Sequence, residues 1–346
     1  MPPYFADTPS ASPSRAHAHR WLKADLHVHT YHSGYNHDLP FLRSRDCYSS
    51  PVAVYHTAKA RGMDLVAITD HDSIDGCREF LDAHPDAPDF IAGEEISCWM
   101  PDAPIEVHFG AYGMTERAHA EIQPLRRNAF DVAAYLREAG IFFSLNHLFH
   151  FYKGQMPLDR YLALLDSVPA LETRNGAMLS AHNRLIEEIR DRYPAQTARA
   201  GALRRLASVA GSDAHTLRRV GRTWTSAPGG TREEFLASVA AGRGIAGGEQ
   251  GGTLPLAADI YGVIADYWLS LVGLKRHEGL TIGRRALGLG FSVVSAPFEF
   301  IPLLIAAAQK RGEASRIAAL ASALSLEAEL ARARAPEPTP GVGISG

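Results

Sequence analysis

The chain has 346 residues, of which 46% are hydrophobic and 21% charged, so it can form one large α/β domain with an appendage or two domains. Its formal net charge of −3 argues against a broad nucleic-acid-binding surface but leaves room for a local basic cleft. The three cysteines, Cys47, Cys77 and Cys98, contain no CxxC pair and cannot all pair internally, so we expect a reduced, cytoplasmic protein.

The first twenty residues are rich in proline and small polar residues. They contain no apolar segment of the kind that a signal peptide needs, so secretion is not expected. We predict a disordered tail at residues 1–20.

Strand-like and helix-like segments alternate after this tail, which is typical of a βα array with a parallel sheet. Gly62 and Gly140 each follow a predicted helix, where glycine commonly marks the end. Strands are expected near 22–28, 64–69, 90–97, 105–112, 141–146, 169–173 and 206–211, and helices include Pro51–Arg61, Arg127–Ala139 and Arg184–Arg192. Seven strands with helices between them favour a closed or distorted barrel, in which the carboxyl ends of the strands meet at one mouth.

The character of the chain changes after Pro228. A helix is expected near 232–241, and the glycine-rich stretch 242–252 is interpreted as a linker. Residues 251–333 are predicted to form a helical extension that supplies no catalytic groups. Residues 334–346 are predicted to form a second disordered tail.

The extension contains an apolar run, Ala286–Ala308, with a single formal charge at Glu299. About 20 apolar residues can span a bilayer, but Pro297, Pro302 and Glu299 in the run argue against a continuous span. Membrane contact, a helical cap and an oligomer face therefore stay open. The sequence leaves the oligomeric state unknown.

His27 and His29 are two residues apart in an alternating run, so their side chains are expected on one face of a strand. Two neighbouring imidazoles make up half of a metal shell. Further His and acidic residues end later apolar runs, in Thr69-Asp70-His71-Asp72, Gly93-Glu94-Glu95, Val107-His108, Asn146-His147 and Gly211-Ser212-Asp213-Ala214-His215. Because these clusters end predicted strands, we expect them to meet at the barrel mouth and bind metal.

Together these motifs resemble, in the same order over residues 22 to about 250, those of the PHP (polymerase and histidinol phosphatase) family of metal-dependent phosphoesterases. The resemblance implies a distorted (β/α)7 barrel over residues 21–250, followed by the C-terminal helical extension. It also implies two or three divalent transition metal ions, such as Zn, Mn or Fe.

The resemblance further implies the ligand sets. Glu95 would bridge two ions, and it is preferred to Glu94 because the family pattern is Gly-x-Glu and only one of two neighbours on a strand faces the mouth. His27, His29, Glu95 and Asp213 would hold the first ion, Glu95, His108 and His147 the second, and His71 and His215 the third. The loop after His29 departs from the family and lacks its usual acidic ligand, so His37, or alternatively His32, is expected to complete the third position.

Several neighbours of these motifs are candidates for supporting roles. Asp25 and Asp70 could orient a ligating imidazole, and Glu172 and Asn175 could line the mouth. For substrate binding the candidates are His150, beside His147, and the arginines Arg218, Arg219 and Arg222, which could grip a phosphate or form a solvated loop. The remaining histidines are expected at the surface: His17, His19, His56, His84, His119, His182 and His277.

Two ions about 3.5–4 Å apart can hold a bridging hydroxide in line with a phosphorus atom. The resemblance therefore implies hydrolysis of a small-molecule or nucleotide phosphomonoester, with His27, His29, Glu95 and Asp213 as catalytic residues. One alternative is a nucleic-acid-processing exonuclease or a regulatory PHP module, and another is a metal-stabilised barrel without catalysis.

Overall fold

The computed structural model describes residues 20–36, 40–148, 156–192, 195–196, 203–204, 206–275, 277 and 279–334. Within these ranges a nine-stranded mixed sheet has the order β11-β10-β1-β2-β3-β4-β5-β6-β9, and β7 pairs with β8 apart from it. The strands are β1 (Trp21–Asp25), β2 (Leu65–Ile68), β3 (Phe90–Trp99), β4 (Glu106–Tyr112), β5 (Phe142–Asn146), β6 (Ala170–Asn175), β7 (Ala195–Gln196), β8 (Leu203–Arg204), β9 (Ala207–Gly211), β10 (Thr223–Pro228) and β11 (Ile245–Gly248).

The large sheet curls until the end of β9 meets the end of β1. Val28 and Ala214 form an isolated parallel bridge, and the backbone N–H of Asp213 donates to the carbonyl of His27 at 2.8 Å. The Thr225 hydroxyl of β10 bonds to both backbone groups of Ala210 in β9. The predicted distorted barrel is thus confirmed as a nearly closed sheet, and all seven predicted strands are present.

Two predictions about the sheet were wrong. The sheet is mixed rather than parallel, because β4 runs antiparallel to both β3 and β5 and β10 runs antiparallel to β1. The stretch 242–252 is not a linker, because β11 within it pairs with β10. Glycine serves packing here, since a Cβ at Gly247 would lie 2.8 Å from the ring nitrogen of Trp224.

Helices connect most of the strands, and several begin at residues that favour helix starts. The Ser50 hydroxyl accepts a hydrogen bond from Ala53 N–H, and Pro51 occupies the first turn of α1. Thr115, Asn128 and Thr231 cap three later helices in the same way. Before the extension the helical segments are α1 (Pro51–Ala60), α2 (Asp75–Ala83), α3 (Glu116–Ile122), the 3-10 turn Gln123–Leu125, α4 (Ala129–Glu138), α5 (Leu158–Ser167), α6 (Ser180–Arg192), α7 (Arg232–Ser238) and the π-turn Val239–Arg243.

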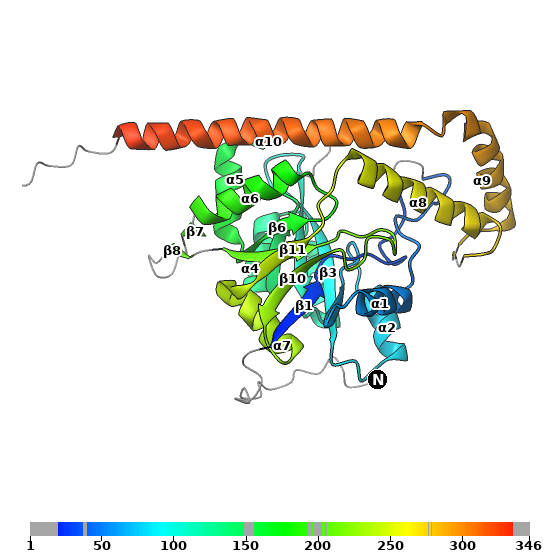
Figure 1. Ribbon diagram of the computed structural model, residues 1–346, viewed down its shortest axis with the longest axis horizontal. Helices are drawn as coiled ribbons and strands as arrows, with labels where there is room; N and C mark the ends of the chain where they lie inside the picture. The colour runs from blue at the N-terminus through cyan, green and yellow to red at the C-terminus, as the bar shows by residue number, and fades with distance from the viewer. Residues whose placement is uncertain are drawn as a thin grey trace, which may run out of the picture.

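The C-terminal extension consists of α8 (Thr253–Leu271), α9 (Ile282–Ser295), the 3-10 turn Ala296–Phe298 and α10 (Ile301–Arg334). Figure 1 shows α10 lying across the barrel and α9 at its edge, beyond α8. Ile317, Leu320 and Leu324 of α10 belong to the largest buried cluster, together with residues of β3–β5 and α4–α6. The long helix therefore contributes side chains to the core.

The extension also contacts the loops that lead into the barrel mouth. Lys310 is buried, and its ammonium group donates to Glu313 at 2.7 Å and to the Ala177 carbonyl at 2.6 Å. On the other side, Leu42 and Tyr48 pack with Tyr267 and Leu271 of α8. The loops after β1 and after β6 are thereby both held by C-terminal helices.

Candidate metal centre

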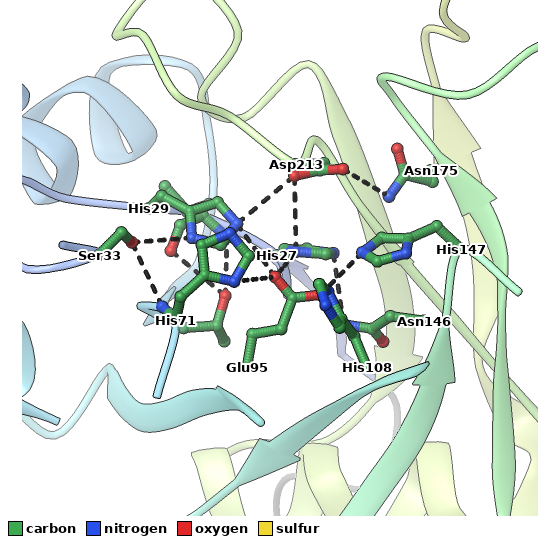
Figure 2. A network of polar contacts seen from close by, with 12 residues as sticks. His27, His29, Ser33, His71, Glu95, His108, Asn146, His147, Asn175 and Asp213 are labelled. Atoms are coloured by element: carbon green, nitrogen blue, oxygen red, sulfur yellow. Dashed lines mark hydrogen bonds and ion pairs between the residues drawn. The ribbon is translucent and has the colours of Figure 1, made fainter. Parts of the chain in front are cut away.

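The predicted ligands that the structure describes converge at the mouth of the barrel (Figure 2). Each one lies on a strand, or just past the end of one, so the sheet fixes their relative positions. The converging residues are His27, His29, His71, Glu95, His108, His147, Asp213 and His215. Four groups of three residues in this set have ligand atoms close enough together to hold an ion. One group consists of three histidines, and each of the others contains one carboxylate.

Glu95 lies at the centre of the cluster and is fully buried. Its Oε2 atom lies 3.0 Å from Nε2 of His27, 3.4 Å from Nε2 of His29 and 3.2 Å from Nδ1 of His71. Its Oε1 atom lies 2.8 Å from Nε2 of His147 and 3.3 Å from Nδ1 of His108. Each carboxylate oxygen therefore faces a separate group of imidazoles, as a bridging ligand would require.

Glu94 points to the other side of β3, as the alternation of a strand requires. Its carboxylate accepts a hydrogen bond from Nδ1 of His119 at 2.9 Å. Glu95 rather than Glu94 thus faces the mouth.

Asp213 joins the two histidines after β1 from the end of the neighbouring strand β9. Its Oδ1 atom lies 3.4 Å from Nε2 of His29 and 3.6 Å from Nε2 of His27. Asp213 has a φ of +52° and His147 a φ of +23°, in the left-handed region that costs free energy for residues with a side chain. Gly211 allows this approach, since a Cβ there would overlap the backbone of His27.

A third potential position is formed by His71, His215 and a residue that the sequence analysis missed, Asp46. The Oδ2 atom of Asp46 lies 2.9 Å from Nε2 of His215 and 3.6 Å from Nε2 of His71. The two ligands considered from the sequence are not seen there: His32 pairs with Glu79 at 2.9 Å, and His37 lies outside the described residues. An acidic side chain that could bind an ion at this position is thus present, but it lies farther along the loop than His32 and His37.

Asp46 reaches the site because its loop doubles back. Asn36 N–H donates to the Ser44 carbonyl, and Asp46 N–H donates to the Gly34 carbonyl at 3.3 Å. Gly34 has a φ of +90°, which favours glycine at this turn. In the sequence Asp46 is the next acidic residue after Asp38, so it could have been considered as a ligand. Its position at the site depends on a turn of the loop that the residue types alone did not indicate.

The charges of the cluster are set by burial and by the carboxylates. Burial lowers the pKa of His29 and of His71 to about 4, so both are neutral at pH 7, which is the form that binds metal. Burial is outweighed at Glu95 and Asp213, where the facing imidazoles hold the pKa well below the usual range. Both carboxylates are therefore ionised.

Protons remain on His108, on His215 and on His27, whose pKa the carboxylates of Glu95, Asp213 and Glu172 hold well above its usual range against the effect of burial. Against the effect of burial, Glu95 raises the pKa of His108 and Asp46 raises the pKa of His215, each to about 10. Without a metal these imidazolium groups balance the buried carboxylates. A divalent cation would balance the same charges and displace the protons.

Two buried atoms test whether a metal fits. Among the residues that the structure describes, Nε2 of His29 and Nδ1 of His108 are buried and form no hydrogen bond. A buried polar atom without a partner is costly, and both atoms point toward Glu95. A metal ion would give each of them a partner, so the residues fit a metal centre.

Hydrogen bonds behind the ligands fix which imidazole nitrogen faces the site. Glu172 accepts from Nδ1 of His27 at 2.8 Å, which leaves Nε2 of His27 toward Glu95. The Ser33 hydroxyl donates to Asp70 and so accepts from Nδ1 of His29 at 3.0 Å. Asp70 thus orients His29 through Ser33, which the sequence analysis did not single out.

Other supporting residues act on the backbone or on the carboxylates. The Asn175 amide donates to Asp213 at 3.2 Å and to Glu172 at 2.9 Å. Asp25 accepts backbone N–H groups of Ser212 and Gly221 rather than an imidazole, so its predicted role is corrected: it fixes the loop that carries Asp213.

The candidate substrate residues lie apart from the ligands or outside the described residues. Arg218 pairs with Asp259 at 2.7 Å, and Arg222 pairs with Glu249 at 2.7 Å. Buried Arg219 donates to the Gly176 carbonyl, so it holds a loop. The three arginines line a cavity of about 450 Å³ beside the start of α8, and His150 lies outside the described residues.

Three of the histidines expected at the surface are not. His182 is fully buried in α6, and His277 is buried with its Nε2 donating to the Arg43 carbonyl at 2.8 Å. His119 is half-buried against Glu94. His182 lies near Lys310 and Arg316 of α10, and His277 lies against Tyr35 and Tyr48 of the loop after β1, and local sequence shows neither arrangement. His56 and His84 are exposed as expected, and His17 and His19 lie outside the described residues.

A family model described as PHP-associated matches residues 196–243. The chain is also similar to an uncharacterized protein of Methanocaldococcus jannaschii, with 42% identity over 55 residues, which are 16% of this chain and 32% of that protein. The chain thus spans about a third of the length of the curated relative that it matches.

Solved structures of similar shape come from several organisms. A two-domain protein of Bacteroides vulgatus containing a predicted PHP-like metal-dependent phosphoesterase has 18% identity and a TM-score of 0.45, over 70% of each chain. PsfC from Pseudomonas syringae has 17% identity and a TM-score of 0.46, over 71% of this chain and 98% of that one. A lesion-specific endonuclease from Pyrococcus furiosus has 18% identity and a TM-score of 0.40, over 64% and 56%.

The matched segment 196–243 contains Asp213 and His215, which close the metal centre from the side of β9. The other PHP motifs of the sequence supply the remaining ligand atoms of the same centre. The chain is therefore similar to PHP proteins in the matched segment, and its other motifs resemble those of the same family.

Proposed function

We propose that the protein is a metal-dependent phosphoesterase that hydrolyses a phosphate monoester of a small molecule or nucleotide. The observation that carries the proposal is Glu95, whose two oxygens face two separate groups of imidazoles. A carboxylate in that position can bridge two ions, while imidazoles hold them without adding charge. When bound, two such ions activate water and offset negative charge on the phosphoryl group.

The contacts among these side chains support the ligand sets that we propose. They are His27, His29, Glu95 and Asp213 for one ion, Glu95, His108 and His147 for the second, and His71, His215 and Asp46 for the third. Glu172 and Ser33 hold the ligating nitrogens of His27 and His29 toward the centre. With a metal bound and the imidazole protons displaced, these groups would be neutral imidazoles and carboxylates, which suit Zn, Mn or Fe.

A small substrate is favoured over a nucleic-acid strand. The net charge is slightly negative, and the exposed arginines Arg218 and Arg222 are already paired with carboxylates. Gripping a phosphate with either arginine would require it to exchange partners. The three cysteines are free and buried, which supports our proposal of a reducing cytoplasmic setting.

The test is a substrate panel with the full-length protein. Phosphomonoesters and short oligonucleotides are incubated with the enzyme and manganese, with and without chelator. We expect release of phosphate from at least one monoester, abolished by chelator. Asp213→Ala should lower the rate more than about 100-fold, since losing even a residue that orients a ligand costs about 10–100-fold.

The matched control is Glu121→Ala, which removes an exposed carboxylate of α3 and should leave the rate unchanged. Cleavage of oligonucleotides without monoester hydrolysis would favour the nucleic-acid-processing alternative. Metal binding without hydrolysis of any substrate would favour a metal-stabilised barrel without catalysis.

A further inference from the structure

The outward half of α9 presents only apolar and small side chains. Ile282, Val293 and Val294 have exposed fractions of 88%, 76% and 73%. Leu287 and Leu289 are also exposed on this helix. A surface helix normally carries polar residues on its solvent side, so this pattern is reversed.

The same surface continues around the turn into α10. Phe298, Phe300 and Leu304 are more than half exposed, and Leu303 and Ile305 are also exposed to a smaller extent. Between Ala286 and Ala308 the only formal charge is Glu299. We call the exposed apolar surface of residues 282–305 the apolar elbow. It is a continuous patch of the kind that marks a site of interaction.

The elbow is held in place by its inner side. Phe291 contacts Phe41 edge to face at 5.7 Å between ring centroids. Arg285 donates to the carbonyls of Ser270 and Leu271, at 2.9 and 3.0 Å, at the end of α8. The outer apolar side chains are therefore presented by a packed helix, and Figure 1 shows α9 at the edge of the molecule.

The chemistry of the elbow fits lipid better than protein. A protein interface carries about one hydrogen bond per 100–200 Å². The elbow offers few groups for that purpose, because its serines, Ser292 and Ser295, donate to carbonyls of their own helix. Arg284 and Arg311 flank the apolar run and could contact anionic headgroups.

The shape indicates entry into one leaflet. Among the described residues no single helix is long and apolar enough to cross a membrane, but Ile282–Phe298 and Ile301–Ser325 together meet the length and composition expected of a span, with a bend of 72° between them. At 1.5 Å per residue α9 measures about 21 Å, less than the roughly 30 Å of a hydrocarbon core. A bent pair of this kind suits an interfacial or re-entrant position.

We propose that the apolar elbow docks the protein on a lipid bilayer, with α9 and the start of α10 buried among the acyl chains at the membrane surface. This role is independent of the hydrolytic activity. It places the enzyme beside a membrane without a continuous transmembrane helix.

Flotation with vesicles tests the proposal. The full-length protein is mixed with vesicles of phosphatidylcholine alone or of phosphatidylcholine with about one third phosphatidylglycerol. We expect the protein to float with the vesicles, more so with the anionic ones, and Val293→Asp/Val294→Asp to lower the bound fraction at least tenfold. Ile245→Asp, on exposed β11, is the matched control and should still bind.

A labelled cysteine reports insertion directly. The native cysteines are buried, so Val293→Cys can be labelled selectively with an environment-sensitive fluorophore, as can the control Ile245→Cys. We expect a blue shift with vesicles only for the label at position 293. Equal flotation of the Val293/Val294 variant and the wild type would overturn the proposal. So would a dimer, abolished by that variant, in a wild-type protein that does not float.

Discussion

Asp46 shows how a single residue can complete a site that its neighbours in sequence do not predict. It follows a loop that doubles back, and this loop brings its carboxylate to the two histidines of the third position. The carboxylate lies closer to His215 than to His71. Carboxylates compensate cation charge that imidazoles do not. The third ion should therefore depend on Asp46.

We expect Asp46→Ala to remove the weakest step from a manganese titration of chelator-treated protein, followed by calorimetry, while the bridged pair still fills. His32→Ala is the control from the same loop and should leave the titration unchanged, since His32 pairs with Glu79. If Asp46→Ala has no effect and His37→Ala removes the weak step, the ligand predicted from the sequence is the correct one.

His182 should make the fold sensitive to acid. Burial lowers its pKa to about 3, against 6.5 for an ordinary histidine. Below pH 6.5 the unfolded chain takes up a proton that the folded protein does not, so stability falls as the pH drops. At pH 5 this proton uptake lowers the free energy of unfolding by about 2 kcal/mol.

His182→Gln should therefore lose less stability than the wild type between pH 7 and pH 5, by about 2 kcal/mol in urea unfolding. His84→Gln, which changes an exposed histidine, should follow the wild-type pH dependence. Parallel curves for all three proteins would show that His182 does not titrate as described.

At the scale of elements, strands that consist of short apolar runs could be predicted from the local sequence. The run Leu65–Ile68 is entirely buried, as its apolar residues indicate. The misses depend on distant partners: β11 pairs with β10 through glycines that resemble a linker, and α10 covers α6 from more than a hundred residues away. The proposed ligands could be named from the sequence because each lies on or just after a strand, whereas Asp46 and Ser33 depend on loop geometry and hydrogen bonds.

The buried pair Lys310–Glu313 fastens α10 to the loop after β6. Glu313 also accepts the backbone N–H of Leu179 at 2.8 Å. Lys310→Met should destabilise the protein by about 3–5 kcal/mol, because it leaves a buried carboxylate unpaired. The double change Lys310→Met/Glu313→Leu should recover part of that loss. Thermal or urea unfolding measures both, and equal destabilisation by the single and double variants would show that the charge pair is not the cause.

At the scale of the whole molecule, the C-terminal helices and the metal centre share one loop. Tyr267 of α8 contacts Leu42 and donates its hydroxyl to the Leu42 carbonyl at 3.2 Å, four residues before Asp46. Although these helices supply none of the metal ligands described here, they hold the segment that presents one.

Tyr267→Ala should therefore weaken the Asp46-dependent ion about tenfold while leaving the bridged pair unchanged, since a misplaced supporting residue typically costs 10–100-fold in metal affinity. Tyr261→Ala, on the same helix but partly exposed, is the matched control. The same manganese titration provides the readout. An equal loss of all ions in Tyr267→Ala would instead indicate general unfolding.

The central claim is that Glu95 bridges metal ions at the barrel mouth, and its most direct test is the metal content of protein purified without chelator. Elemental analysis should find at least two equivalents of Zn, Mn or Fe in the wild type and in Glu94→Gln, which changes the neighbouring buried carboxylate that faces away. Glu95→Gln should retain less than one equivalent, because an amide cannot supply the bridging charge. Metal-free wild type that takes up no ion on addition, or a Glu95→Gln variant with full metal content, would contradict the account.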